Sequence, residues 1–303
     1  MAASSKKVIY AALVANAIIA LIKFGAAFLT GSSAMFSEGI HTTVDTGNQL
    51  MLLLGIKKAQ KPADENHPFG YGKEIYFWSF IVAIMVFAVG AGVSIYEGIH
   101  SVMDPHPIEN VMLNYGVLGF AIIATGIAWY FALKAFNQVK EDKGFFETVH
   151  GEKNPTTFVV LFEDSAALAG LFVALAGIGL SQWTGNPIFD GIASICIGLI
   201  LGTTAAWLAY ETKGLLIGES ADPKIISGIK NIASRHKAIK AINEALTIHM
   251  GPEYILATLS VDFEDSLTAS LIEEDIDKIT KEIKQSFPNV KRVFVEAEPP
   301  NQN

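Results

Sequence analysis

The strongest constraint in this chain is a set of long apolar segments without a charged residue. They cover residues 75–96, 110–133, 165–189 and 191–210. Each is about as long as the roughly 20 apolar residues that a helix needs to cross a bilayer. Only 17% of the 303 residues are charged, against about 25% in an average soluble protein. These features exclude a disordered chain and a wholly soluble globule, and they predict an integral membrane protein.

Two further apolar segments carry a few charges. Residues 8–30 contain Lys23, and residues 33–55 contain Glu38 and Asp45. The sequence thus predicts a polytopic α-helical membrane protein with six transmembrane helices, whose first helix is too long for a cleaved signal peptide. The predicted helices cover residues 8–30, 33–57, 74–101, 111–138, 156–182 and 187–213. Together they define a six-helix transmembrane domain over residues 1–217.

Lysines lie on one side of these predicted helices. They precede the first helix or fall between helices two and three and between four and five: Lys6, Lys7, Lys57, Lys58, Lys61, Lys73, Lys140, Lys143 and Lys153. The opposite connections, residues 31–32, 103–110 and 183–186, contain neither lysine nor arginine. Because cytoplasmic loops are enriched in these residues, we expect both termini to be cytoplasmic. As its location we expect the plasma (inner) membrane.

The composition changes after Gly218. Residues 218–303 carry 14 acidic and 10 basic side chains. Their patterns predict, in order, helix 223–236, strands 238–250 and 254–263, helix 267–287 and strand 290–298. This αββαβ order favours a small α+β sandwich of ferredoxin-like type as a separate cytosolic domain over residues 218–303.

Several function classes are disfavoured by composition. The net charge of −8 offers no basic footprint for nucleic acid. Cys196 is the one cysteine, so the chain has neither a disulfide framework nor a cysteine-based metal cage. No nucleophile motif accompanies the ionisable residues within the apolar segments, so we expect that the protein is not an enzyme. We also expect no prosthetic group.

Ionisable residues inside the predicted helices are the candidate functional residues, because burying them at bilayer depth is costly. His41 and Asp45 are four residues apart and share one helix face. Glu163 and Asp164 enter the membrane from the opposite side, and the rise per residue puts them near the same depth. An imidazole with two or three carboxylates suits a divalent ion, zinc above all.

Purely structural interpretations of these residues also stay open. A single His–Asp pair can simply join two helices, and Asn48 either supports the metal site or makes an ordinary interhelical hydrogen bond. In the loop after the second helix, Asp64 and His67 form a weaker candidate metal site, with Tyr71 a poor third ligand. A turn that positions the third helix is the favoured interpretation of that loop.

These residues resemble the cation diffusion facilitator family over nearly the whole chain. The likeness rests on segment 37–45 (SEGIHTTVD), on loop 64–72 (DENHPFGYG), on Asp164 and on the αββαβ tail. Segments 45–49 and 161–167 look most like the branch that includes the ninth vertebrate zinc transporter. The resemblance implies a homodimer of six-helix protomers that exports divalent metal from the cytosol, usually against protons.

The resemblance also assigns residues. His41, Asp45 and Asp164 match three ligands of the tetrahedral site of the family, whereas Val160 stands where the fourth ligand is expected. Glu163 is then either the fourth ligand or a vestibule residue that collects ions.

We therefore expect a Zn²⁺ exporter that works by proton-coupled alternating access. Its partners are the divalent ion as substrate, protons as counter-ion, the lipid bilayer and a second copy of the chain. Two alternatives are an efflux transporter of the same family for manganese, iron, cobalt or nickel, and a metal-responsive membrane scaffold that moves no ions.

Overall fold

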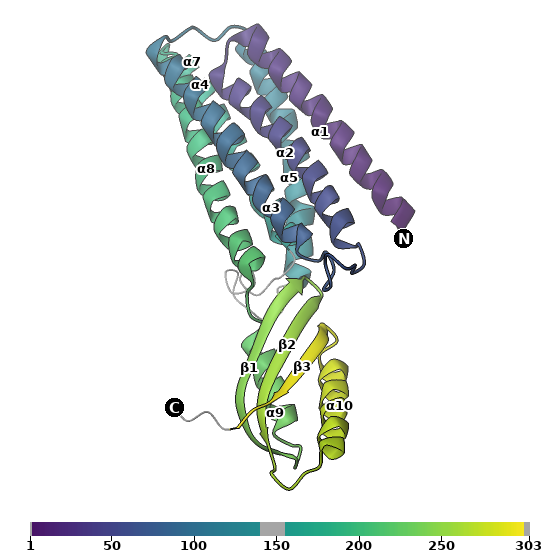
Figure 1. Cartoon of the computed structure of the whole chain (residues 1–303). Helices are drawn as coiled ribbons and strands as arrows, with labels where there is room; N and C mark the ends of the chain where they lie inside the picture. Colours follow the sequence, from purple (N-terminus) through teal and green to yellow (C-terminus); the bar gives the residue numbers. More distant parts are fainter. Residues whose placement is uncertain (1, 140–154, 300–303) are drawn as a thin grey trace. The chain divides into compact units, whose positions relative to one another are not determined.

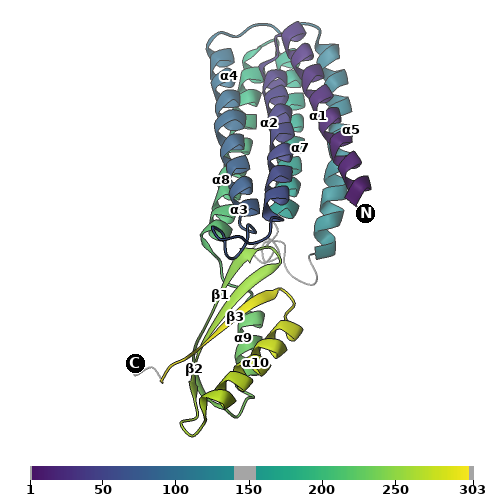
Figure 2. The same cartoon turned by 45° about the vertical axis from the view of Figure 1, so that its right-hand side comes forward.

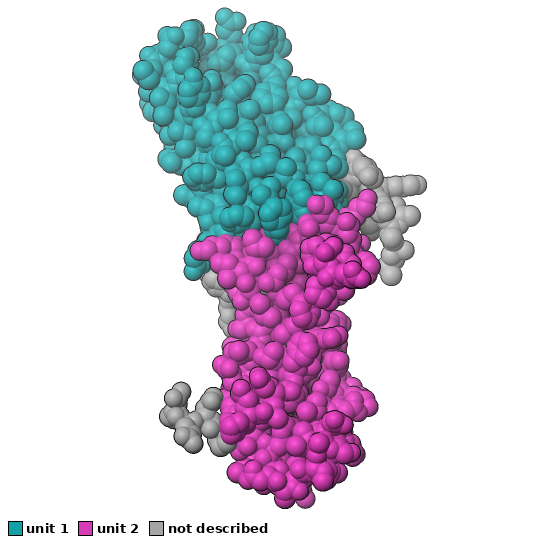
Figure 3. All heavy atoms as spheres, in the orientation of Figure 1, with its two compact units in different colours: residues 1–56, 77–212 teal, residues 57–76, 213–303 magenta. Residues whose placement is uncertain are grey.

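The computed structural model describes residues 2–139 and 155–299. The chain forms two compact units, residues 1–56 with 77–212 and residues 57–76 with 213–303 (Figure 3). Lys140, Lys143 and Lys153, which contribute to the predicted orientation, lie outside the described residues.

The first unit is built from long helices that run side by side (Figures 1 and 2). Their bounds are α1 (Ala2–Thr30), α2 (Ser33–Ala59), α3 (Glu74–Met85), α4 (Gly92–Met103), α5 (Val111–Val139), α7 (Pro155–Thr184) and α8 (Ile188–Ile217). Four helical segments of the described chain are long and apolar enough to cross a membrane: Glu74–Met103, Val111–Lys134, Phe158–Thr184 and Ile188–Ile217. A helical membrane domain is thus confirmed, and α1 and α2 coincide with the two predicted helices that carry charges.

The predicted third helix contains an irregularity that periodicity did not reveal. A π-helical segment, Val86–Ala91, joins α3 to α4. Such segments interrupt the regular hydrogen-bond ladder and are frequent at functional sites. The sequence gives no sign of it because this helix is apolar nearly all round, so a widened turn leaves its hydrophobic pattern unchanged.

Small residues let α8 approach its neighbours closely. A Cβ atom at Gly98 of α4 would lie 2.7 Å from the carbonyl oxygen of Gly191 in α8. A Cβ atom at Gly177 of α7 would collide with Ala193 of α8. Without a hydrophobic driving force between helices in lipid, such close backbone packing is a main source of helix association.

The second unit contains the C-terminal sheet. Its elements are α9 (Pro223–Ala233), β1 (Ile239–Gly251), β2 (Tyr254–Phe263), α10 (Ala269–Ser286) and β3 (Val290–Ala297). The strand order is β1-β2-β3, with β1 antiparallel and β3 parallel to β2. Ile229 of α9, Val261 of β2 and Ile279 of α10 are each 0% exposed in one shared core. The two helices therefore pack on the sheet and bury its apolar side.

Candidate functional site

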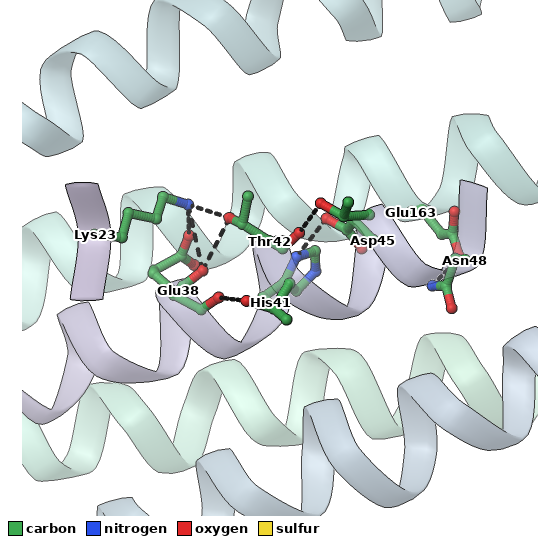
Figure 4. A network of polar contacts seen from close by, with 10 residues as sticks. Lys23, Glu38, His41, Thr42, Asp45, Asn48 and Glu163 are labelled. Carbon is green, nitrogen blue, oxygen red and sulfur yellow. Dashed lines mark hydrogen bonds and ion pairs between the residues drawn. The ribbon is translucent and has the colours of Figure 1, made fainter. Parts of the chain in front are cut away.

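Helices α2 and α7 bring the predicted ligands to one level of the bundle. The amide of Asn48 in α2 donates a hydrogen bond of 2.8 Å to Glu163 Oε1 in α7 (Figure 4). Asn48 and Glu163 are 0% and 8% exposed. Since Asn48 is one turn from Asp45 and Glu163 is next to Asp164, this bond agrees with the equal depth expected from helix rise.

A cavity of about 440 Å³ lies beside these carboxylates. Asp45, Glu163 and Asp164 line it. Its other polar lining residues are Asn16, Lys23, Thr42, Gln49 and Thr125. Three carboxylates on one intramembrane cavity need a compensating positive charge, because unpaired charges in a low-dielectric region are strongly unfavourable.

His41 is buried beside Asp45. Its Nδ1 lies 2.8 Å from Asp45 Oδ2 one turn along α2, and its side chain is 4% exposed. When Nδ1 carries the proton it donates to Asp45, and Nε2 keeps the lone pair that a metal ion requires. Asp45 thereby orients the imidazole as well as lining the cavity.

The described residues hold no ready-made coordination shell. Across residues 2–139 and 155–299, no three His, Cys, Asp or Glu side chains are grouped as metal ligands. An ion held by His41, Asp45 and Asp164 would therefore draw these side chains inward from their positions here. Their role as ligands stays a prediction.

Glu163 stands next to the predicted gap in the ligand set. One of its oxygens accepts the hydrogen bond from Asn48, and its side chain lines the cavity together with Val160. Asn48 therefore contacts the site through Glu163. This arrangement keeps both interpretations of Glu163 open, as a fourth ligand and as a vestibule residue.

A buried ion pair joins α1 to α2 and was not anticipated as such. Lys23 Nζ lies 2.8 Å from Glu38 Oε2 and donates a hydrogen bond of 2.9 Å to Thr42 Oγ1 (Figure 4). Lys23 and Glu38 are 3% and 0% exposed. Glu38 is thus buried and paired with Lys23. The sequence signal for this pair is the presence of opposite charges in adjacent predicted helices.

Asp190 of α8 also has a role that the sequence did not indicate. Its carboxylate accepts hydrogen bonds from Ser32 Oγ at 2.8 Å, the Ser33 amide at 2.5 Å and the Ala34 amide at 3.3 Å. These groups form the N-terminus of α2, where backbone N–H groups have no partner within the helix. Asp190 therefore caps and positions the helix that carries His41 and Asp45.

The loop predicted as a weaker metal site is exposed and internally hydrogen-bonded. Asp64 accepts from the His67 amide at 2.8 Å and from the Tyr71 hydroxyl at 2.7 Å. Donation by Tyr71, followed by the His67 amide, lowers the pKa of Asp64 below its ordinary 3.8, and the same bond raises the pKa of Tyr71. Both carboxylate oxygens serve the turn, which supports the turn interpretation.

Comparison with known proteins finds a family model and several relatives that match most of this chain. The family model for the cation efflux transmembrane domain matches residues 9–217. The proton-coupled zinc antiporter SLC30A9, mitochondrial, of Xenopus laevis is 34% identical over 283 residues, covering 92% of this chain and 51% of the relative. Manganese efflux system protein MneP of Bacillus subtilis (strain 168) is 24% identical over 295 residues, covering 97% of this chain and 96% of the relative. Metal tolerance protein C4 of Arabidopsis thaliana is 25% identical over 338 residues, covering 98% of this chain and 74% of the relative.

The SLC30A9 relatives correct one expectation. This chain spans about half their length, and they are named as mitochondrial, which contradicts the predicted plasma membrane location. The prediction was wrong because lysine asymmetry reports the orientation of helices in a membrane and says nothing of which membrane it is. The resemblance found in the sequence is itself confirmed: the chain belongs to the cation efflux family.

Proposed function

We propose that this chain is a transporter that moves Zn²⁺ across a membrane in exchange for protons, by alternating access. The observation that carries the proposal is the intramembrane cavity lined by Asp45, Glu163 and Asp164, with His41 held by Asp45. The names of the SLC30A9 relatives support zinc as substrate, protons as counter-ion and a mitochondrial membrane as location. Zn²⁺ is substrate here, and no prosthetic group is part of the proposal.

Proton exchange follows from the chemistry of the ligands. A metal ion binds the neutral form of His41 and the charged forms of Asp45 and Asp164, so protons and metal compete for the same atoms. Each metal ion that binds displaces protons from these groups, and each release lets protons return. A proton gradient can therefore drive metal transport through this one site.

The architecture we propose has six membrane-spanning helices over residues 1–217 and a ferredoxin-like domain over residues 218–303. Helices α1 and α2 are as long as the four apolar ones, which supports six spans and both termini on one side. The order α9-β1-β2-α10-β3 supports the fold of the tail.

A homodimer is part of the proposal and has one structural argument in its favour. Leu246 of β1 and Phe294 of β3 both pair with Thr258 of β2, so they lie in one row across the sheet. They are 56% and 44% exposed. Two exposed apolar side chains in one row of the sheet, on the side away from the helices, suit contact with a second copy of the tail.

Manganese is the second candidate substrate. His41 is not among the residues that line the cavity. Most of the possible metal ligands on the cavity wall are oxygen atoms, which come from the three carboxylates and from Asn16, Thr42, Gln49 and Thr125. Oxygen ligands suit Mn²⁺ better than Zn²⁺. The relative MneP is named as a manganese efflux protein.

Ion-resolved flux in proteoliposomes tests the proposed function. Purified protein is reconstituted, and uptake of Zn²⁺ and Mn²⁺ is measured with the vesicle interior either acidic or at the external pH. We expect Zn²⁺ uptake to be faster into acidic vesicles, with Mn²⁺ slower. Manganese uptake faster than zinc uptake would favour the second candidate, and metal binding without flux of either ion would identify a scaffold.

A further inference from the structure

Lys23 belongs to a buried ion pair of the first unit and also lines the cavity there. Its ammonium pairs with Glu38 at 2.8 Å, and its side chain also lines the cavity that contains Asp45, Glu163 and Asp164. Glu38, by contrast, is not among the residues that line this cavity. A fixed positive charge therefore stands on the wall of a site proposed to bind a divalent cation.

The position of the ammonium is set by three contacts on α2. Lys23 Nζ approaches Glu38 Oε2 at 2.8 Å, Thr42 Oγ1 at 2.9 Å and the Glu38 carbonyl oxygen at 3.5 Å. Thr42 in turn donates to the Glu38 carbonyl at 3.0 Å. These contacts use the three donors of the ammonium and hold it at Glu38 and Thr42. Thr42 is within one turn of both His41 and Asp45.

Room for the Glu38 carboxylate is provided by α7. A Cβ atom at Gly170 would lie 2.5 Å from Glu38 Oε1. Among the described residues this oxygen is buried without a hydrogen-bond partner. The carboxylate is therefore only partly satisfied, and its main interaction is with the Lys23 charge, which it neutralises.

We propose that Lys23 is a built-in counter-charge that weakens cation binding in the cavity, and that Glu38 limits this effect by neutralising the ammonium. The proposal rests on the proposed function and concerns how tightly the ion is held. The ammonium repels a divalent ion and attracts the carboxylates that would bind it, and in a low-dielectric region both effects are strong. A transporter must release its ion as well as bind it, and a lysine on the cavity wall keeps affinity low enough for release.

A purely structural ion pair makes a different prediction. If the pair only fastens α1 to α2, removing either partner leaves the other charge buried and unpaired. Both single variants would then lose stability, and neither would change metal affinity in a direction set by charge. The sign of the change in affinity separates the two roles.

The test is a charge cycle with Zn²⁺ as probe. Affinity is measured by titration calorimetry on the purified full-length chain for wild type, Lys23→Gln, Glu38→Gln and the double variant. We expect Lys23→Gln to bind Zn²⁺ about tenfold more tightly, Glu38→Gln to bind about tenfold more weakly, and the double variant to lie near wild type. In proteoliposomes, Lys23→Gln should also transport more slowly at saturating Zn²⁺, because release becomes slower.

Asn114→Ala is the matched control, since Asn114 is also buried and is bonded to α1 through Thr30 Oγ1, but does not line the cavity. It should lower the melting temperature and leave Zn²⁺ affinity within about twofold of wild type. Weaker or unchanged binding by Lys23→Gln, or tighter or unchanged binding by Glu38→Gln, would overturn the proposal. If one single variant fails to fold, the direction of the change in Zn²⁺ affinity in the other still tests the proposal. Absence of Zn²⁺ binding by wild type would instead refute the proposed function itself.

Discussion

Replacing Asp190 with alanine should destabilise the helical unit by about 2–4 kcal/mol. The carboxylate accepts from the Ser33 and Ala34 amides and from Ser32 Oγ. The hydroxyl can rotate to another acceptor, but the two amides cannot, and an unsatisfied buried donor costs about 1–3 kcal/mol. Loss of a helix N-cap by itself costs only about 0.5–2 kcal/mol. We therefore expect a total in the lower part of the range obtained by adding the costs of the two unsatisfied amide donors.

Asp190→Asn should cost less, because its amide oxygen still accepts a hydrogen bond. It loses the interaction of a negative charge with the N-terminus of α2, which is about 0.3–1 kcal/mol. The order of stability should therefore be wild type, Asp190→Asn, then Asp190→Ala.

Thermal unfolding in detergent, followed by intrinsic fluorescence, measures both variants. For a unit of this size, 1 kcal/mol shifts the melting temperature by about 2–4 °C, so we expect losses of about 5–15 °C for alanine and about 1–4 °C for asparagine. Thr203→Ala, at an exposed position of the same helix, is the control and should melt as wild type does. An alanine variant that melts with wild type, or an asparagine variant as unstable as alanine, would refute the assigned cap.

Three further predictions concern separate parts of the chain. Glu163→Gln should weaken Zn²⁺ binding about tenfold, about 1.4 kcal/mol, whereas Asn48→Ala, which removes one interhelical hydrogen bond, should weaken it by about threefold or less; unchanged affinity of Glu163→Gln in calorimetry would leave Glu163 a vestibule residue. Tyr71→Phe removes the main donor to Asp64, so the pKa of Asp64 should rise toward its ordinary 3.8 in a carbon-13 NMR titration. Because that pKa is depressed in the folded chain, the stabilisation is present above the ordinary pKa and is lost as pH falls through the folded value, so the variant should have less of this stabilisation to lose on acidification; an unmoved titration would contradict this. Ile279→Ala, at a position 0% exposed in the tail core, should destabilise the tail by about 2–5 kcal/mol equally with Zn²⁺ and with EDTA, and a rescue by Zn²⁺ would reveal metal ligands in the tail.

The helices of the first unit could be predicted because lipid imposes a length and a composition on any helix that crosses it. The predicted segment 33–57 is α2, Ser33–Ala59, and the segment 111–138 is α5, Val111–Val139. The close spacing of His41 and Asp45 also predicted their contact, since side chains four residues apart on a helix are neighbours.

Contacts between distant segments could not be predicted in this way. Asp190 caps the start of α2 from more than 150 residues away, and nothing in either local sequence indicates the other. The partner of Glu38 is hidden for the same reason, because nothing in the sequence around Glu38 points to Lys23 of α1. In the tail, Ile242 of β1 packs against the core, yet Leu246, four residues further along the same strand, is 56% exposed. That strand contains register irregularities, and one extra residue moves the following side chains to the other face.

The most direct test of the proposed site is Zn²⁺ flux by Asp45→Ala and Asp164→Ala in proteoliposomes. Both side chains line the cavity, and removing one of several neighbouring carboxylates relieves like-charge repulsion, so both variants should fold. Glu274→Gln, which removes an exposed carboxylate of the tail paired with Lys278, is the matched control. We expect no transport by either alanine variant and full transport by the control. Zn²⁺ flux near the wild-type rate in either alanine variant would contradict the assignment of this cavity as the transport site.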